Sequence, residues 1–203
     1  MNKFVAHPWH GIPLYDKEPN VVNAFIEVTP SDTVKYELDK TTGLLGIDRP
    51  QLFSNICPTL YGMLPQTYCG QRVAEICSTK FGRKDIVGDA DPLDICVLTE
   101  KLITTGNILL RAIPIGGIKL IDNNEADDKI VAVLKDDALY GDWQDISQCP
   151  SKVLERLEHY FLTYKKAPNS KGNKCEIIDI YGREEALELI KLASEDYQEK
   201  FHG

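Results

Sequence analysis

The chain has 203 residues, of which 43% are hydrophobic, and this is enough to bury one substantial core. We therefore expect a single domain over residues 1–203. The formal net charge of −8 argues against a surface for nucleic acid or anionic membrane, because both need a basic patch. No apolar run is long enough for a signal peptide or a membrane span, and the six cysteines show no C-x-x-C pair, so we expect reduced thiols in a cytoplasmic protein.

Short, strand-like segments fill the chain from residue 24 to residue 134. They are rich in Val, Ile and Leu, with a period of two or a wholly apolar sequence, and glycines separate them. Many short strands with short turns favour a closed or partly closed barrel over alternating strands and helices. The predicted strands are residues 24–29, 34–39, 44–49, 73–80, 93–99, 107–115, 119–121 and 129–134.

The period changes after Pro150. Val153, Leu157 and Tyr160 recur at helical spacing, which predicts an amphipathic helix packed against the barrel. Residues 175–181 are predicted to form a strand, and a last helix follows. The apolar stripe of that helix comprises Ala186, Leu189, Ile190, Ala193 and Tyr197. The expected fold class is therefore mainly β (α+β), with helices that flank the strands.

Three carboxylates, those of Asp89, Asp91 and Asp94, precede or begin one of the predicted strands. Pro92 fixes its own φ and is expected to restrain Ala90 and Asp91 to extended geometry, so the three carboxylates are held close together. Oxygen ligands on a short rigid segment suit Mg²⁺, Mn²⁺ or Ca²⁺, and two such ions can polarise a phosphoryl group and activate a water. A second acidic run, residues 122–129, follows another apolar stretch and can complete the same site.

Two other interpretations of the first cluster need weighing. A solvated acidic turn is one, although Pro92 disfavours it by restraining the backbone. A calcium-binding loop is the other, because counting from Asp89 puts Glu100 at position twelve. That loop needs glycine at position six, where this chain has Asp94, so the calcium loop is excluded.

Basic and phenolic residues stand where the predicted strands and helices end. Metal ligands on one side and phosphate donors on the other are what phosphoryl chemistry needs. The residues concerned are Lys35, Arg49, Tyr61, Tyr164 and Lys165, and Glu37 shares a predicted strand with Lys35.

With these residues in view, the chain resembles the soluble family I inorganic pyrophosphatases, which hydrolyse pyrophosphate to two phosphates. The resemblance covers nearly the whole chain, and its central part is the Gly-Asp-Ala-Asp-Pro-Leu-Asp sequence at 88–94. The remaining similar segments are 7–14, 25–28, 35–37, 48–50 and 61–67, then Asp122, Asp127 and Lys129, and finally Tyr164 with Lys165.

The resemblance implies a role for each matching residue. Asp91 would be the general base that accepts the proton of the attacking water. The metal ligands would be Asp89, Asp94, Asp122 and Asp127, with Mg²⁺ as the cofactor and Mn²⁺ or Co²⁺ as possible substitutes. The two phosphoryl groups would be bound by Lys35, Arg49, Tyr61, Lys129, Tyr164 and Lys165, with Glu27 and Glu37 in support. The implied fold is a small closed five-stranded OB-like antiparallel barrel with flanking helices, and the implied assembly is a homo-oligomer, either a dimer or a hexamer.

Three positions differ from many relatives. Cys57 stands in place of an aromatic residue and is expected to be structural, Asn123 stands in place of Glu, and segment 68–87 is longer than in compact bacterial members. Two other functions compete with pyrophosphate hydrolysis. Another metal-dependent phosphohydrolase or nucleotide pyrophosphatase would need an aromatic stacking pair with a glycine-rich cradle, which the sequence lacks. An OB-like binding module for nucleic acid or cations is disfavoured by the acidic charge.

Overall fold

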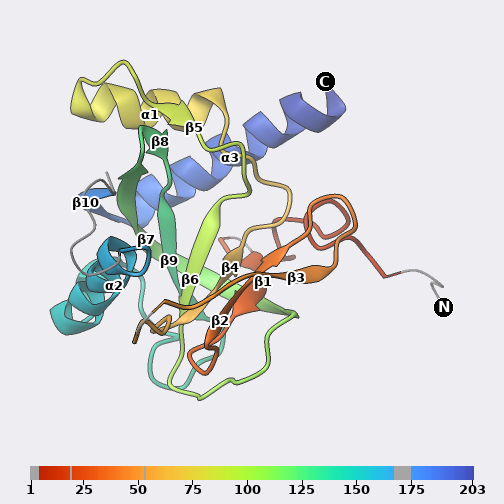
Figure 1. The fold of residues 1–203 in the computed structure, drawn as a ribbon, viewed down its shortest axis with the longest axis vertical. Helices are drawn as coiled ribbons and strands as arrows, with labels where there is room; N and C mark the ends of the chain where they lie inside the picture. The colour runs from red at the N-terminus through yellow and green to blue at the C-terminus, as the bar shows by residue number, and fades with distance from the viewer. Residues whose placement is uncertain (1–4, 19, 53, 167–174) are drawn as a thin grey trace.

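The computed structural model describes residues 5–18, 20–52, 54–166 and 175–203. In this part of the chain, one large sheet and a small two-stranded sheet are flanked by three helices (Figure 1). None of the described helices is long and apolar enough to cross a membrane. The expected mainly β class with flanking helices is confirmed.

Five strands of the large sheet form a ring. The strands are β1 (Val22–Val28), β4 (Leu60–Met63), β6 (Asp94–Leu98), β9 (Lys129–Leu134) and β7 (Ile108–Asp122). Each pairs with the next in this order, and β7 pairs with β1 to complete the ring. The prediction that all these strands are antiparallel is wrong, because β6 pairs with β9 in parallel. β4 runs antiparallel to both β1 and β6, and β7 runs antiparallel to both β1 and β9. β6 and β9 therefore point in the same direction as β1.

Shorter strands extend this ring. β10 (Glu176–Gly182) pairs with β7 in antiparallel orientation, while β5 (Val87–Gly88) and β8 (Glu125–Ala126) pair with each other in parallel beside the end of β7. β2 (Val34–Leu38) and β3 (Leu45–Pro50) form a separate antiparallel hairpin.

Two glycines that we interpreted as turn residues lie inside strands. β7 is one strand of 15 residues, not the two predicted at 107–115 and 119–121. A Cβ at Gly117 would lie 2.3 Å from Cζ of Tyr181, so the lack of a side chain at this position makes room for the Tyr181 ring against the strand. Likewise Gly62 lies within β4, which was not predicted, and a Cβ there would lie 1.9 Å from the carbonyl oxygen of Phe25. Close approach of the Tyr181 ring at Gly117 and of the β1 backbone at Gly62, rather than a turn, explains both glycines.

The predicted strand at 73–80 is wrong, because these residues belong to α1 (Gln71–Phe81). Val73, Ala74 and Cys77 are its buried residues, and this spacing is helical. Gly82 ends the helix in the left-handed conformation with φ 63°. Val73 and Cys77 would also share one face of a strand, which is why the sequence alone misled us.

The two predicted C-terminal helices are confirmed. α2 (Ser151–Thr163) buries Leu157, Tyr160 and Phe161. α3 (Arg183–His202) buries the predicted stripe of Ala186, Leu189, Ile190, Ala193 and Tyr197. A short 3-10 helix, η1 (Ile146–Gln148), precedes α2. Figure 1 shows α1 and α3 at one end of the sheet, with α2 at another side.

Candidate active site

A short loop between β5 and β6 carries the first acidic cluster. The extended geometry expected for Ala90 is wrong, because this residue has φ 64°, a left-handed conformation that residues other than glycine adopt at a cost. Pro92 restrains only the residue directly before it. The backbone N–H of Asp91 donates to Oδ1 of Asp89 at 3.0 Å, so one carboxylate orders the loop from inside. Asp94 is the first residue of β6.

The parallel pairing of β6 with β9 places Asp94 opposite Lys129. The ammonium group of Lys129 is 2.5 Å from Oδ2 of Asp94 and also contacts Asp127. Tyr61, on β4, donates from its hydroxyl to the same Asp94 oxygen. Although burial opposes the charge of Lys129, the carboxylates of Asp127 and Asp94 raise its pKa well above the ordinary value.

Residues of β1 and the β2–β3 hairpin form another wall of the site, facing Asp94 and Lys129. Glu27, on β1, accepts a hydrogen bond at 2.8 Å from the backbone N–H of Leu38, which ties the hairpin to the ring. Burial raises the pKa of Glu27 to about 8. Lys35 lies 2.5 Å from Glu37 and 3.1 Å from Asp48, so its ammonium group is held on the hairpin.

The end of α2 supplies Tyr164 and Lys165. The ammonium group of Lys165 lies 2.6 Å from Oδ2 of Asp122, at the end of β7. The guanidinium carbon of Arg49 lies 5.6 Å from the centre of the Tyr164 ring, within the range of a cation–π contact.

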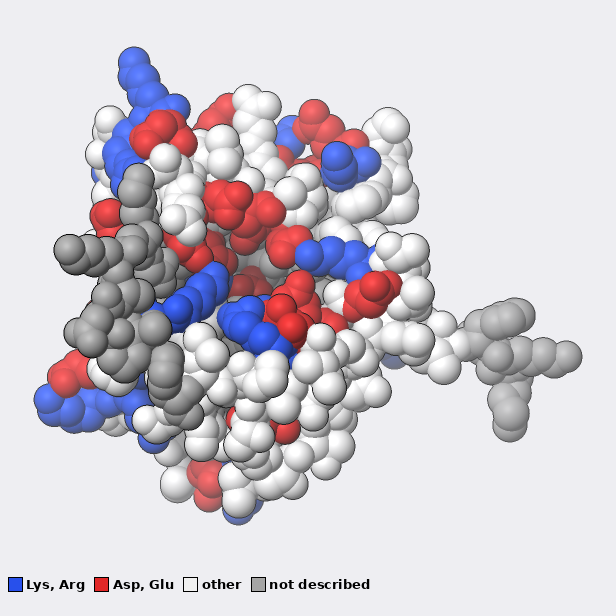
Figure 2. Space-filling model, viewed as in Figure 1, with Lys and Arg blue, Asp and Glu red and all other residues white. Residues whose placement is uncertain are grey.

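These walls enclose one cavity of about 200 Å³. Figure 2 shows acidic side chains gathered around a hollow near the centre of this face, with basic side chains beside them. All the predicted site residues line the cavity except Arg49, which stands behind Tyr164. They are Glu27, Lys35, Glu37, Tyr61, Asp89, Asp91, Asp94, Asp122, Asp127, Lys129, Tyr164 and Lys165.

Lys40 also lines the cavity, and the sequence analysis missed it. Its ammonium group contacts Oδ1 of Asp91 and lies 3.9 Å from Glu37. Its sequence position carries a weak signal, because it follows the same predicted strand as Lys35. That signal does not distinguish it from an ordinary exposed lysine.

The carboxylates repel one another where they meet. Burial, followed by the charge of Asp127, raises the pKa of Asp89 to about 8. Burial also raises the pKa of Asp127, against the effect of Lys129. Carboxylates that are costly to ionise together become stable as anions when cations join them.

The donor set therefore fits a divalent cation in its chemistry, since all the acidic donors are oxygens. Among the described residues, however, no three His, Cys, Asp or Glu side chains are arranged to hold a metal ion as they stand. The ammonium groups of Lys40, Lys129 and Lys165 pair with the carboxylates instead. A carboxylate paired with one ammonium group still has lone pairs with which it can bind a cation.

Comparisons with known proteins give a consistent result. The family model described as "Inorganic pyrophosphatase" matches residues 24–198. An inorganic pyrophosphatase of Chlamydia trachomatis serovar L2 is 57% identical over 197 residues, which are 95% of this chain and 94% of that protein. The chain belongs to the inorganic pyrophosphatase family. It is an enzyme of the inorganic diphosphatase class.

More distant relatives agree. Soluble inorganic pyrophosphatase 2 of Chlamydomonas reinhardtii is 36% identical and covers 97% of this chain and 91% of that protein. The crystal structure of inorganic pyrophosphatase from Thermus thermophilus superposes with a TM-score of 0.78 at 26% identity, covering 96% of this chain and 99% of that chain. The resemblance to soluble family I inorganic pyrophosphatases is thus confirmed.

None of the six cysteines, all of which the structure describes, lines this cavity. All six are buried and free. Burial raises the pKa of the Cys57 thiol to about 11, so it remains protonated near neutral pH. This environment agrees with the structural role expected for Cys57.

Proposed function

We propose that the enzyme hydrolyses inorganic pyrophosphate to two orthophosphates in the cavity between the β2–β3 hairpin and the end of α2, with a divalent metal ion as cofactor. The observation that carries this proposal is the convergence of carboxylates, lysines and tyrosines on one cavity. Carboxylates alone would repel a pyrophosphate anion. We therefore assign substrate binding to the basic residues and cation binding to most of the carboxylates.

Substrate binding is assigned to the basic and phenolic residues. Lys35 approaches from the hairpin, and Lys129 and Lys165 approach from the opposite wall. Tyr61 and Tyr164 add hydroxyl donors, and Arg49 lies next to Tyr164. Donors on two walls can hold the two phosphoryl groups separately, which positions the bridging oxygen between them.

Proton transfer is assigned to Asp91. Water attacks one phosphorus atom, a new P–O bond forms, and the bond from that phosphorus to the bridging oxygen breaks. Asp91 accepts the proton of the water as a general base, and the departing phosphate takes up a proton. Asp91 suits this task because its carboxylate lies on a restrained loop and lines the cavity.

Metal binding is assigned to Asp89, Asp94, Asp122 and Asp127, with Glu27 and Glu37 in support. We propose Mg²⁺ as the cofactor, with Mn²⁺ or Co²⁺ as substitutes, because oxygen donors accept each of these ions. A bound cation would supply Lewis acidity toward the phosphoryl oxygens and the attacking water. We also propose that the enzyme is cytoplasmic and that it forms a homo-oligomer, either a dimer or a hexamer. Within each chain, we propose that the five-stranded ring has an OB-like topology.

The test is release of orthophosphate from pyrophosphate by the purified enzyme, with and without Mg²⁺. We expect rapid hydrolysis that needs Mg²⁺ and is lost with chelator. A nucleoside triphosphate serves as the control substrate and should be hydrolysed far more slowly. Preference for the nucleotide, or a rate independent of divalent metal, would contradict the proposal.

A further inference from the structure

The loop that carries Asp89 and Asp91 rests on a neighbouring piece of backbone. The N–H of Ala90 donates to the carbonyl of Cys69 at 3.1 Å, and the N–H of Cys69 donates to the carbonyl of Asp91 at 2.8 Å. A Cβ at Gly88 would lie 2.1 Å from the Cys69 oxygen, so the two segments are packed as closely as backbones allow. The left-handed conformation of Ala90 persists only if such contacts hold it.

The same piece of backbone begins α1. Helix α1 starts at Gln71, immediately after Cys69 and Gly70. The first N–H groups of any helix lack partners within the helix and need acceptors from elsewhere. The position of the catalytic loop therefore depends on what holds the start of α1.

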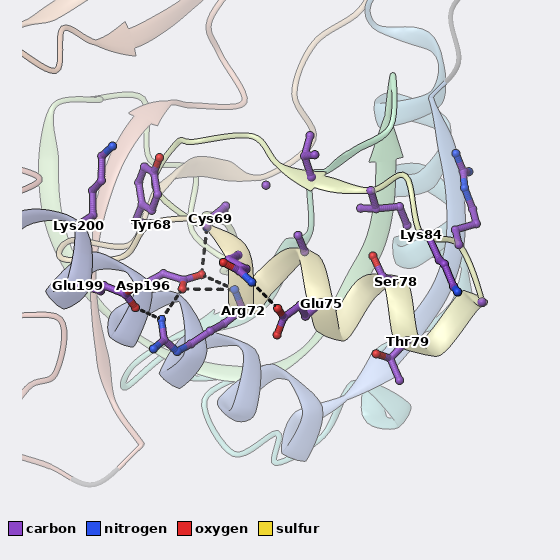
Figure 3. A pocket seen from close by; sticks show the side chains of 18 residues that line it. Tyr68, Cys69, Arg72, Glu75, Ser78, Thr79, Lys84, Asp196, Glu199 and Lys200 are labelled. Atoms are coloured by element: carbon purple, nitrogen blue, oxygen red, sulfur yellow. Dashed lines mark hydrogen bonds and ion pairs between the residues drawn. The ribbon is translucent and has the colours of Figure 1, made fainter.

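Asp196 of α3 supplies that acceptor. Its Oδ2 accepts hydrogen bonds from the backbone N–H groups of Gly70 at 3.1 Å, Arg72 at 3.1 Å and Val73 at 3.3 Å. Only 5% of Asp196 is exposed. A carboxylate also suits the positive end of the dipole of α1. Figure 3 shows Asp196 reaching from α3 toward the start of α1, beside Cys69 and Arg72.

A second contact between the helices lies further out. The guanidinium Nη1 of Arg72 lies 2.9 Å from Oδ1 of Asp196 and 2.6 Å from Oε2 of Glu199. Glu199 is exposed, and it contacts α1 through the Arg72 side chain. The Glu199 contact thus joins α1 to α3 without touching the backbone that holds the loop.

We propose that Asp196 is a positioning residue for pyrophosphate hydrolysis, which fixes the Asp89–Asp91 loop through the backbone of Cys69 and Gly70. The inference rests on the function proposed above for Asp89 and Asp91. Asp196 does not line the cavity, so it acts on the reaction only through this backbone. The substrate ligands Lys35, Lys129 and Lys165 stand on other elements and keep their positions.

The experiment compares Asp196→Ala, Asp196→Asn and Glu199→Ala under conditions in which each variant is folded. In Asp196→Ala, kcat should fall by about tenfold to a hundredfold, because small misplacements of catalytic groups are costly. The Mg²⁺ concentration for half-maximal activity should rise severalfold, while KM for pyrophosphate should change less than threefold. A mere loss of folded enzyme would lower kcat and leave the Mg²⁺ requirement unchanged.

The other two variants make the test specific. Asp196→Asn should recover most of the activity, because an amide oxygen at the Oδ2 position can accept from all three N–H groups. The second bond of the Arg72 N–H and the ion pair of the Arg72 guanidinium, both to Oδ1, are lost. Glu199→Ala should behave like the wild type. If Asp196→Ala does not fold, Asp196→Glu keeps the charge but displaces the oxygens, and the same changes in kcat and Mg²⁺ requirement are expected.

Hydrogen exchange gives a readout that does not depend on activity. The amides of Ala90 and Cys69 should exchange faster in Asp196→Ala, whereas those of β9 should not. Wild-type kcat and Mg²⁺ requirement in Asp196→Ala, or equal damage in Glu199→Ala, would overturn the inference. If the wild type fails to hydrolyse pyrophosphate, the proposed function fails, and the exchange comparison still decides whether Asp196 holds the loop.

Discussion

The carboxylates of Asp91 and Asp94 belong to one motif but have different neighbours. Asp91 pairs with Lys40 on the hairpin, whereas Asp94 accepts from Tyr61 and Lys129 deep between the strands. An exposed carboxylate on a loop can exchange protons with water, and a carboxylate fixed between strands is better placed to hold a cation. This contrast supports the different roles proposed for the two residues.

Asparagine substitutions separate these roles. Asp91→Asn should lower kcat by about 10²–10⁴, the usual contribution of a general base, with a smaller loss of Mg²⁺ affinity. Asp94→Asn should weaken Mg²⁺ binding and turnover together. The Asp91→Asn enzyme should regain part of its rate at high pH, where the attacking water loses its proton without help. Mg²⁺ titrations and pH–rate profiles check this, and equal metal weakening with unchanged profiles in both variants would contradict it.

A substitution at Gly88, the residue before the Asp89–Asp91 loop, tests how the loop is held. In Gly88→Ala the new methyl group meets the carbonyl oxygens of Cys69 at 2.1 Å and Gly70 at 2.6 Å, and backbone cannot move aside easily. We expect a loss of about 1–3 kcal/mol in the free energy of unfolding, together with a fall in kcat. Gly82→Ala is the control, because its φ of 63° makes it strained but nothing lies within 4 Å of the new methyl group. It should lower the melting temperature and leave kcat unchanged, so equal kcat losses would refute a specific effect on the loop.

Among single elements, the β2–β3 hairpin carries Lys35 and Arg49 but none of the aspartates proposed to hold metal. Its turn contains Gly43, which has φ 72° and lies against His7 of the N-terminal segment. A Cβ at Gly43 would be 2.7 Å from Cδ2 of His7. The turn therefore fixes where the hairpin stands relative to the ring.

Gly43→Ala should move the hairpin and weaken substrate binding. The left-handed conformation costs about 1–2 kcal/mol for an L residue, and the contact with His7 adds to this. Because the hairpin carries the proposed substrate ligands Lys35 and Arg49, KM should rise severalfold while kcat changes less. Gly46→Ala is the control, since its Cβ would meet only Glu37 O, at 3.8 Å. Steady-state kinetics of both variants provide the measurement, and a fall in kcat alone for Gly43→Ala would show that the hairpin has another role.

The elements differ in how far the sequence predicts them. β1, β6, β9 and the apolar stripe of α3 follow from local periodicity, so they were predicted well. β4 and the full length of β7 were missed, because the glycines inside them resemble turn residues. α1 was not predicted, because Val73 and Cys77 would also share one face of a strand, and the Asp196 carboxylate that accepts from its first N–H groups lies more than 100 residues away in sequence. The proposed site residues were predicted from the family resemblance, and all but Arg49 line the cavity, whereas Lys40 reaches it only through the fold of the hairpin.

At the scale of the whole molecule, the excess of acidic residues makes the stability of the fold sensitive to bound cations. The formal net charge is −8, and buried carboxylates such as Asp89 and Asp127 meet at the cavity. Lysine ammonium groups balance part of this charge. A divalent cation that binds only the folded chain would stabilise it further.

Thermal melts should therefore depend on Mg²⁺. Ligand at 100 times its dissociation constant adds about 2.7 kcal/mol to the free energy of unfolding. For a chain of this size each kcal/mol shifts the melting temperature by about 2–4 °C, so Mg²⁺ should raise it by roughly 5–11 °C over the value with chelator. The shift should shrink in Asp94→Asn and Asp127→Asn, which lose proposed ligands. It should persist in Glu155→Gln, a control whose exposed carboxylate pairs with Lys152 on the surface of α2. Identical melts with Mg²⁺ and with chelator, or equal shifts in all variants, would contradict metal binding by these aspartates.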